Sequence, residues 1–158
     1  MQQRVWAYTE FSALCWAESE YRASEAWTVE ALRLLQCPES LVQVRSAVVK
    51  VDALRQACRA FISSRKYAKA GIAGQVREIF VYGNHNSSVM PQGIVSQACV
   101  ELALSSFGGD HPRYAEALCD YAYYFLNVDN VKKSVELYKK ALDVRRAQYA
   151  IVNGQCFA

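Results

Sequence analysis

Apolar and small side chains recur along the start of the chain at spacings of three, four and seven residues, the period of amphipathic α-helices. The first series is Tyr8, Phe11 and Cys15, followed by Tyr21, Ser24, Thr28, Ala31 and Leu32. The polar run Glu18-Ser19-Glu20 separates its two halves, and Pro38 ends the second half because proline disfavours a helical conformation in the residue before it. Residues 5–36 are therefore predicted to form one unit of two short helices.

Two further units follow with the same periodicity. Residues 48–106 begin with Val51, Leu54, Ala57, Cys58 and Phe61 on one helix face. Residues 112–147 carry Ala115, Leu118, Tyr121, Ala122 and Phe125, then a turn at Asn127 to Asn130, then Val131, Ser134, Tyr138, Ala141 and Leu142. The pattern is lost after this unit, so residues 148–158 are predicted to form an irregular tail.

The third unit shows how its two helices are expected to pack. Leu118, Tyr121 and Phe125 fill the space between antiparallel helices, whereas Ala122 and Ser134 stand where only small side chains let the backbones approach. This is the tetratricopeptide (TPR) pattern, a helix-turn-helix of about 34 residues that must stack to bury its apolar face. The predicted fold is all-α, with TPR hairpins stacked as a right-handed α-solenoid whose first helices line a concave groove.

The middle unit departs from the pattern between Gly71 and Gln97. This stretch carries several glycines, a proline and the run Asn84-His85-Asn86-Ser87-Ser88, none of which continues a helix. Residues 71–97 are therefore predicted to be an insertion or sequence foreign to the fold.

Composition and charge narrow the possible partners. The chain has 158 residues, 53% of them hydrophobic, and a net charge of +3 that comes from scattered Lys and Arg rather than from a basic block. Such a pattern predicts no nucleic-acid partner. The start of the chain has no signal-peptide pattern and no apolar run approaches the roughly 18 residues of a membrane helix. We expect a cytoplasmic protein without membrane insertion, with cytoskeletal and nuclear pools as further expectations.

Three side chains are candidates for a peptide-binding groove. Arg55 and Arg59 lie one helical turn apart at groove-facing positions, where two guanidinium groups could grip a peptide carboxylate. The alternative is that both are solvated charges, with Arg55 paired to Asp52 one turn earlier. Tyr123 lies about 200° around the helix from Tyr121 and so is predicted to face the groove.

Other aromatic residues of the run DYAYYFLNVDN are assigned to packing. Tyr121 and Phe125 share the core-facing side with Leu118, and Tyr124 is expected on a flank toward a neighbouring helix.

The candidate chemistry does not favour an enzyme. The six cysteines form no CxxC pair and no sequence signature places a base beside any of them, so they are expected to be reduced, packed thiols. His85 and His111 have no partners at metal-ligand spacing, and Gly71 and Gly74 lack the Lys-Ser or Lys-Thr of a phosphate loop. No catalytic residue, metal or cofactor is predicted.

A more specific signal surrounds the third unit, at His111-Pro112, Tyr114, Leu118, Asp120-Tyr121 and Leu126 to Asn130. With the kinesin-light-chain-like linker before it, this sequence resembles the amyloid protein-binding family of TPR adaptors. The resemblance implies binding to the cytoplasmic tail of the amyloid precursor protein, association with microtubules, and service as a C-degron receptor of a cullin-RING ubiquitin ligase. It also implies that the chain is a fragment without the ligase-docking region.

Three hypotheses follow from these observations. The leading one is a non-enzymatic TPR module that binds a protein or peptide through Arg55, Arg59 and Tyr123. The second is an architectural repeat spacer with no ligand of its own, and the third is a cysteine-dependent enzyme.

Overall fold

The computed structural model describes residues 1–36, 46–63 and 94–155, and over these residues it is entirely α-helical. The helices are α1 (Gln2–Ala17), α2 (Tyr21–Gln36), α4 (Ala47–Ser63), α7 (Ile94–Phe107), α8 (Pro112–Asn127) and α9 (Val131–Gln155). No strand occurs within the described residues, so the all-α prediction is confirmed.

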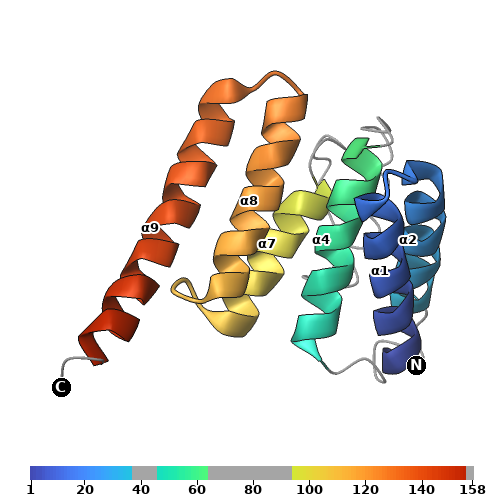
Figure 1. Cartoon of the computed structure of the whole chain (residues 1–158), viewed down its shortest axis with the longest axis horizontal. Coiled ribbons are helices and arrows are strands. Elements are labelled where there is room, and N and C mark those ends of the chain that lie inside the picture. The colour runs from blue at the N-terminus through green and yellow to red at the C-terminus, as the bar shows by residue number, and fades with distance from the viewer. Residues whose placement is uncertain (37–45, 64–93, 156–158) are drawn as a thin grey trace, which may run out of the picture.

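The helices form three antiparallel pairs that stand side by side in one row (Figure 1). α1 packs on α2, α4 on α7 and α8 on α9, and the first helices of successive pairs also touch, α1 with α4 and α4 with α8. Each later first helix also covers the second helix of the pair before it, since α4 packs on α2 and α8 on α7. This arrangement is TPR-like, whereas the right-handed sense of the stack stays a prediction.

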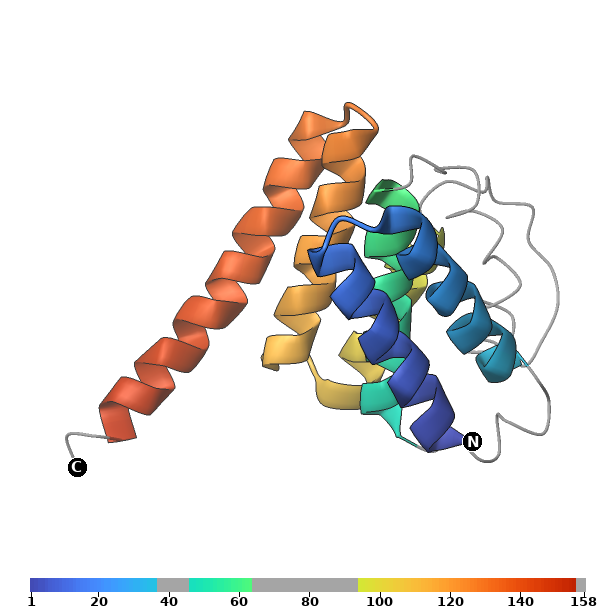
Figure 2. The ribbon, with the colours of Figure 1, turned by 45° about the vertical axis from the view of Figure 1, so that its right-hand side comes forward.

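Two predicted boundaries are wrong. α7 begins at Ile94, so residues 94–97 are helical rather than part of the insertion, and residues 71–93 lie outside the described part of the chain. α9 continues to Gln155, so the predicted irregular tail is helical for residues 148–155, and its long helix projects beyond α8 (Figure 2). The segment has no proline and its only glycine is Gly154, so nothing before that residue breaks the helix. The division into units at 5–36, 48–106 and 112–147 stays a prediction.

Capping side chains and a glycine determine the turns before and after α8. The Nδ1 atom of His111 accepts a hydrogen bond of 3.1 Å from the backbone N–H of Arg113, and Pro112 occupies the first turn, where it loses no helical hydrogen bond. Before it, Gly108 has a φ of +90°, a conformation that favours glycine. At the other end of α8, the side chain of Asn130 accepts from the backbone N–H of Lys133 and begins α9.

The three pairs share one close contact between a first-helix residue and a serine on the second helix. In the first pair, the hydroxyl oxygens of Ser12 and Ser24 are 3.0 Å apart. In the middle pair, the Ser96 hydroxyl donates to the sulfur of Cys58 at 3.2 Å. In the third pair, the Ser134 hydroxyl donates to the backbone carbonyl of Ala122 at 2.8 Å. The two partners are 12 residues apart in the sequence in the first and third pairs but 38 apart in the middle pair. The residues that the middle pair has beyond the other two therefore lie between α4 and α7. Ala122 and Ser134 are 0% and 1% exposed, which confirms the prediction that the third pair closes on small side chains.

The predicted inner face of α1 is wrong. The buried side of this helix is Val5, Thr9 and Ser12, whereas Phe11 is 48% exposed and packs with Tyr8 around the ring of Trp27. Because the Ser12 hydroxyl bonds the backbone carbonyl of Ser24 and the hydroxyl of Thr28, small polar groups fill the contact that apolar residues were expected to fill.

The aromatic run on α8 is also arranged differently from the prediction. Tyr124 is the buried ring, at 2% exposure, whereas Tyr121 and Phe125 are only partly buried, with ring centres 4.7 Å apart and ring planes tilted by 46°. α8 contacts α4, α7 and α9, so a residue on a flank of the pair is covered by a neighbouring helix.

Candidate peptide-binding surface

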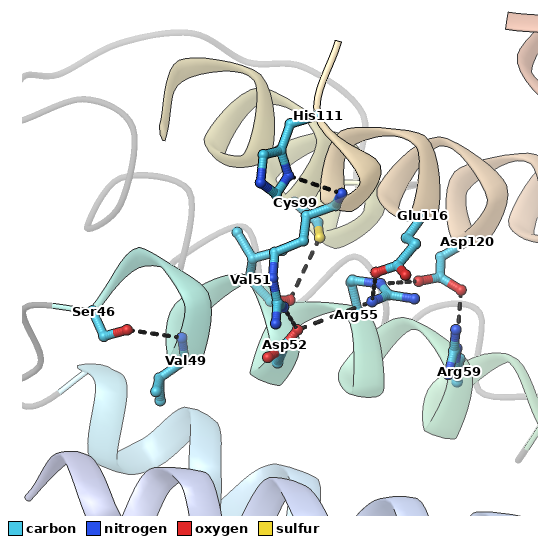
Figure 3. Close-up of polar contacts among 11 residues, drawn as sticks. Ser46, Val49, Val51, Asp52, Arg55, Arg59, Cys99, His111, Glu116 and Asp120 are labelled. Atoms are coloured by element: carbon cyan, nitrogen blue, oxygen red, sulfur yellow. Dashed lines mark hydrogen bonds and ion pairs between the residues drawn. The ribbon is translucent and has the colours of Figure 1, made fainter. Parts of the chain in front are cut away.

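Arg55 and Arg59 lie on the least buried side of α4, together with Asp52 and Ser63. The rest of the helix is almost wholly buried because α1, α2, α7 and α8 all pack against it. The side chain of Arg55 is 15% exposed and that of Arg59 is 34% exposed. The two arginines point toward α8 in Figure 3, across the boundary between the second and third pairs.

Asp120 of α8 bridges the two arginines. Its Oδ2 atom accepts from the Nε of Arg55 at 2.7 Å and its Oδ1 atom accepts from the Nε of Arg59 at 2.9 Å (Figure 3). The Asp120 side chain is only 8% exposed. The pair of arginines therefore does grip a carboxylate, and the one it grips belongs to the chain itself.

Further charges extend this contact along α4 and α8. Glu116 accepts from Arg55 Nη1 at 2.5 Å, Asp52 binds Arg113, and Asp52 also lies 4.0 Å from Arg55. We call the whole set the ion network: Asp52, Arg55, Arg59, Arg113, Glu116 and Asp120. It contains as many carboxylates as guanidinium groups, so the surface carries little net charge.

The ion network keeps Arg55 charged despite its burial. Loss of solvent works to lower the pKa of Arg55, but the Asp120 and Glu116 carboxylates outweigh it and raise that pKa above its usual value. Arg55 is therefore a charged, paired side chain in the contact between α4 and α8.

Arg59, like Arg113, makes a single hydrogen bond within the ion network. Among the described residues its only hydrogen bond runs from Nε to Asp120, and its guanidinium carbon lies 5.8 Å from the ring centre of Trp16 on α1. Trp16 in turn donates from Nε1 to the hydroxyl of Ser63 at 2.8 Å, which fixes the ring beside the arginine. Within the described residues the two terminal nitrogens of Arg59 make no hydrogen bond, so this guanidinium group could receive a carboxylate next to an aromatic ring.

Tyr123 lies on α8, about one helical turn after Asp120. It is half-buried on α8, and its backbone carbonyl accepts from the side chain of Asn127 at 2.8 Å. No hydrogen bond or ring contact joins Tyr123 to Arg55 or Arg59 in the described part of the chain. The structure thus joins two of the three predicted site residues through Asp120, whereas no such contact to Tyr123 occurs within the described residues.

The residues that sequence reasoning missed are Asp120, Glu116 and Trp16. A signal for the first two was present, because Glu116 and Asp120 are spaced one helical turn apart on one first helix, as Arg55 and Arg59 are on the preceding one. Opposite charges at matched spacing on stacked helices predict a ladder between them. Nothing in the local sequence of Trp16 indicated that its ring would meet Arg59.

Three of the described cysteines are poor nucleophiles. Burial raises the pKa of Cys58 to about 12 and raises that of Cys99 well above its usual value, and burial also raises the pKa of Cys119. His111 caps a helix, and the part of the chain that the structure describes contains no cluster of His, Cys, Asp or Glu suited to a metal ion. Among the described helices, none has both the length and the apolar character that crossing a bilayer requires.

Fold and surface together define a class: an all-α, TPR-like helical repeat with a charge-balanced row of side chains across its first helices. Within that class the chain is similar to amyloid protein-binding protein 2 of Rattus norvegicus and of Mus musculus. Each is 33% identical over 146 residues, which is 92% of this chain and 20% of the relative. The chain thus spans about one fifth of the length of these relatives, and the resemblance predicted from the sequence is confirmed. No family model matches the chain, and no solved structure matches it.

Proposed function

We propose that the chain is a non-enzymatic protein-binding module of the adaptor type, and that its ligand is a peptide segment with a carboxylate that meets Arg59. The observation that carries the proposal is the Arg59 side chain, which is 34% exposed, lies beside the ring of Trp16 and has two terminal nitrogens that bond no other described residue. The name of the relatives, an amyloid protein-binding protein, supports a protein-binding role.

Each neighbour of Arg59 has a distinct part in this site. Asp120 orients the guanidinium through Nε, Arg55 holds Asp120 in place, and Trp16 gives a peptide an apolar surface next to the charge. A free C-terminal carboxylate or an acidic side chain could then accept two parallel hydrogen bonds from the outer edge of Arg59. Tyr123, farther along α8, is proposed to contact a neighbouring part of the same peptide.

A second candidate function has its own support. Because Asp120 already pairs with both arginines, the ion network could serve only to hold neighbouring repeats in register. In that case the chain is an architectural spacer with no ligand of its own.

The family resemblance adds finer proposals about partners. The ligand would be the cytoplasmic tail of the amyloid precursor protein or a C-terminal degron, and a longer protein containing this sequence would associate with microtubules and with a cullin-RING ubiquitin ligase. A cytoplasmic location, with cytoskeletal and nuclear pools, belongs to the same proposal.

One set of variants distinguishes a peptide-binding module from an architectural spacer. The probe is a fluorescently labelled peptide with the C-terminal sequence of the amyloid precursor protein tail, and binding is followed by fluorescence anisotropy. Arg59→Ala should weaken binding at least tenfold, whereas Arg33→Ala, which removes an exposed arginine from α2, should leave it unchanged. Asp120→Asn, which releases both arginines from a charged partner, should tighten binding.

A spacer would behave differently in the same assay. It would bind the peptide no better than an unrelated sequence, and neither Arg59→Ala nor Asp120→Asn would change the signal. Equal losses for Arg59→Ala and Arg33→Ala would also contradict the proposed site, because they would show general charge attraction.

A further inference from the structure

Ser63, the last residue of α4, lies one helical turn after Arg59 on the same side of the helix. Both side chains are partly exposed, whereas residues 60–62 between them are buried. α4 stands between α1 and α8 in the row of first helices and packs against both (Figure 1). The surface that Arg59 and Ser63 share is therefore flanked by described helices on both sides.

The hydroxyl of Ser63 has a proton without a described acceptor. Its oxygen lies 2.8 Å from Nε1 of Trp16, and an indole nitrogen can only donate, so the serine oxygen is the acceptor in this bond. A serine inside a helix often donates to the backbone carbonyl four residues earlier, which here belongs to Arg59, but no such bond occurs among the described residues. The Ser63 hydroxyl is thus held by Trp16 and retains a donor for another group.

Trp16 organises both donors of this surface. The centre of its ring lies 5.8 Å from the guanidinium carbon of Arg59, and its ring nitrogen binds Ser63. Within the described residues, Arg55 and Arg113 make no cation–π contact of this kind, and their printed partners are carboxylates. Arg59 is therefore the arginine of the ion network that has an oriented hydroxyl one turn away.

The spacing of these donors suits a carboxylate. The Cβ atoms of residues four apart on a helix are about 5–6 Å from each other. Hydrogen bonds of about 2.7–3.0 Å to the two oxygens of one carboxylate can bridge that distance. Each carboxylate oxygen can accept two hydrogen bonds, so a bond from Ser63 adds to those from the terminal nitrogens of Arg59 without displacing them.

We propose that Ser63 is a second ligand-contacting residue, whose hydroxyl donates to the same carboxylate that Arg59 binds. Trp16 is a positioning residue, because it acts on the ligand through the hydroxyl that its Nε1 holds. The inference rests on the proposed function and narrows its ligand to a group with two acceptor oxygens. A carboxamide has one oxygen and an NH2 group, so it would leave the proton of Ser63 facing another donor.

The test is fluorescence anisotropy on the whole chain with one labelled peptide, which carries the C-terminal sequence of the amyloid precursor protein tail. The peptide is prepared as the free acid and as the C-terminal amide. Ser63→Ala should weaken binding of the free acid about three- to tenfold and change binding of the amide much less, so the preference for the acid shrinks. Ser63→Thr, which keeps a hydroxyl, should retain most of that preference.

The matched control is Ser105→Ala. Ser105 is an exposed serine of α7 whose hydroxyl donates to the backbone carbonyl of Leu102 at 3.1 Å. Its loss should leave the affinity for both forms of the peptide unchanged. Far-UV circular dichroism of each variant checks that the helices are intact.

A second variant tests the role of Trp16. Trp16→Phe keeps an aromatic ring but removes the N–H that binds Ser63, so it should reduce the preference for the acid severalfold. The double variant with Ser63→Ala should lose less than the sum of the two single losses, because both act through the same hydroxyl. Fully additive losses would contradict the positioning role.

The results also separate this inference from the proposed function. If Arg59→Ala abolishes the preference for the acid while Ser63→Ala binds both forms like the wild type, the role of Ser63 is overturned and the proposed function stands. Equal losses for the acid and the amide in Ser63→Ala would show a structural role and would overturn the inference too. A wild type that binds neither form, or both equally, contradicts the proposed function and this inference with it.

Discussion

Replacing Asp120 by alanine tests whether the ion network holds the second and third helix pairs together. The substitution removes a carboxylate that is 8% exposed and that accepts one hydrogen bond from Arg55 at 2.7 Å and one from Arg59 at 2.9 Å. A hydrogen bond to a charged group contributes about 1.5–3 kcal/mol. The hydrogen bond from Arg55 is expected in the upper part of that range because Arg55 is itself well buried, whereas the bond from the more exposed Arg59 contributes about 0.5–1 kcal/mol.

These contributions predict that Asp120→Ala lowers the free energy of unfolding by about 3 kcal/mol. For a chain of this size, each kcal/mol corresponds to about 2–4 °C, so the melting temperature should fall by about 6–12 °C. Thermal and urea unfolding followed by circular dichroism would measure both quantities. The double variant Asp120→Ala with Arg55→Ala should lose less than the sum of the two single losses, because both remove the same bond.

The matched control is Glu30→Gln. Glu30 accepts from Arg33 at a similar distance, 2.9 Å, but both side chains are exposed, so the loss should be about 0.5 kcal/mol or less. If Asp120→Ala costs no more than this control, the ion network is solvated and does not hold the helix pairs in register.

Three further measurements test packing and thiol chemistry. Ser134→Val should lower the free energy of unfolding by about 1–3 kcal/mol, because it removes the hydrogen bond to Ala122 and enlarges a closely packed contact; an unchanged urea midpoint would contradict this. In native protein, Cys58 and Cys99, each 1% exposed, should react with a thiol reagent far more slowly than half-buried Cys15, and equal rates would mean the α4–α7 contact opens freely. Burial also raises the pKa of Cys58 from 9.0 to about 12, so its contribution to stability is complete below pH 9 and is lost as pH rises toward 12. The urea midpoint should therefore fall more steeply over this range than it does in Cys58→Ala, and parallel curves for the two proteins would contradict the shift.

Periodicity predicted the helices because their apolar faces are regular. In α8 and α9 the spacing of Leu118, Ala122 and Ser134 was enough to predict both the pairing and the close approach of the backbones. In α1 the same reasoning chose the wrong face, because polar Thr9 and Ser12 are buried through hydrogen bonds that periodicity does not reveal.

The candidate site was predicted only in part, for a different reason. The positions of Arg55 and Arg59 follow from the repeat, but their partner Asp120 lies more than 60 residues away, on a helix beyond the irregular sequence. Single-residue patterns do not show which charges meet across stacked helices. The three-dimensional arrangement changes the interpretation of the site, from two unpaired cations to two cations bound to Asp120, of which Arg59 is the more exposed.

Anisotropy titrations with two forms of one peptide test the central claim most directly. A peptide with the C-terminal sequence of the amyloid precursor protein tail would be prepared once with a free C-terminal carboxylate and once as the amide. The carboxylate that Arg59 is proposed to hold predicts that the free acid binds at least tenfold more tightly, and that this preference disappears in Arg59→Ala. Equal affinity for the acid and the amide would contradict the claim that Arg59 binds a C-terminal carboxylate.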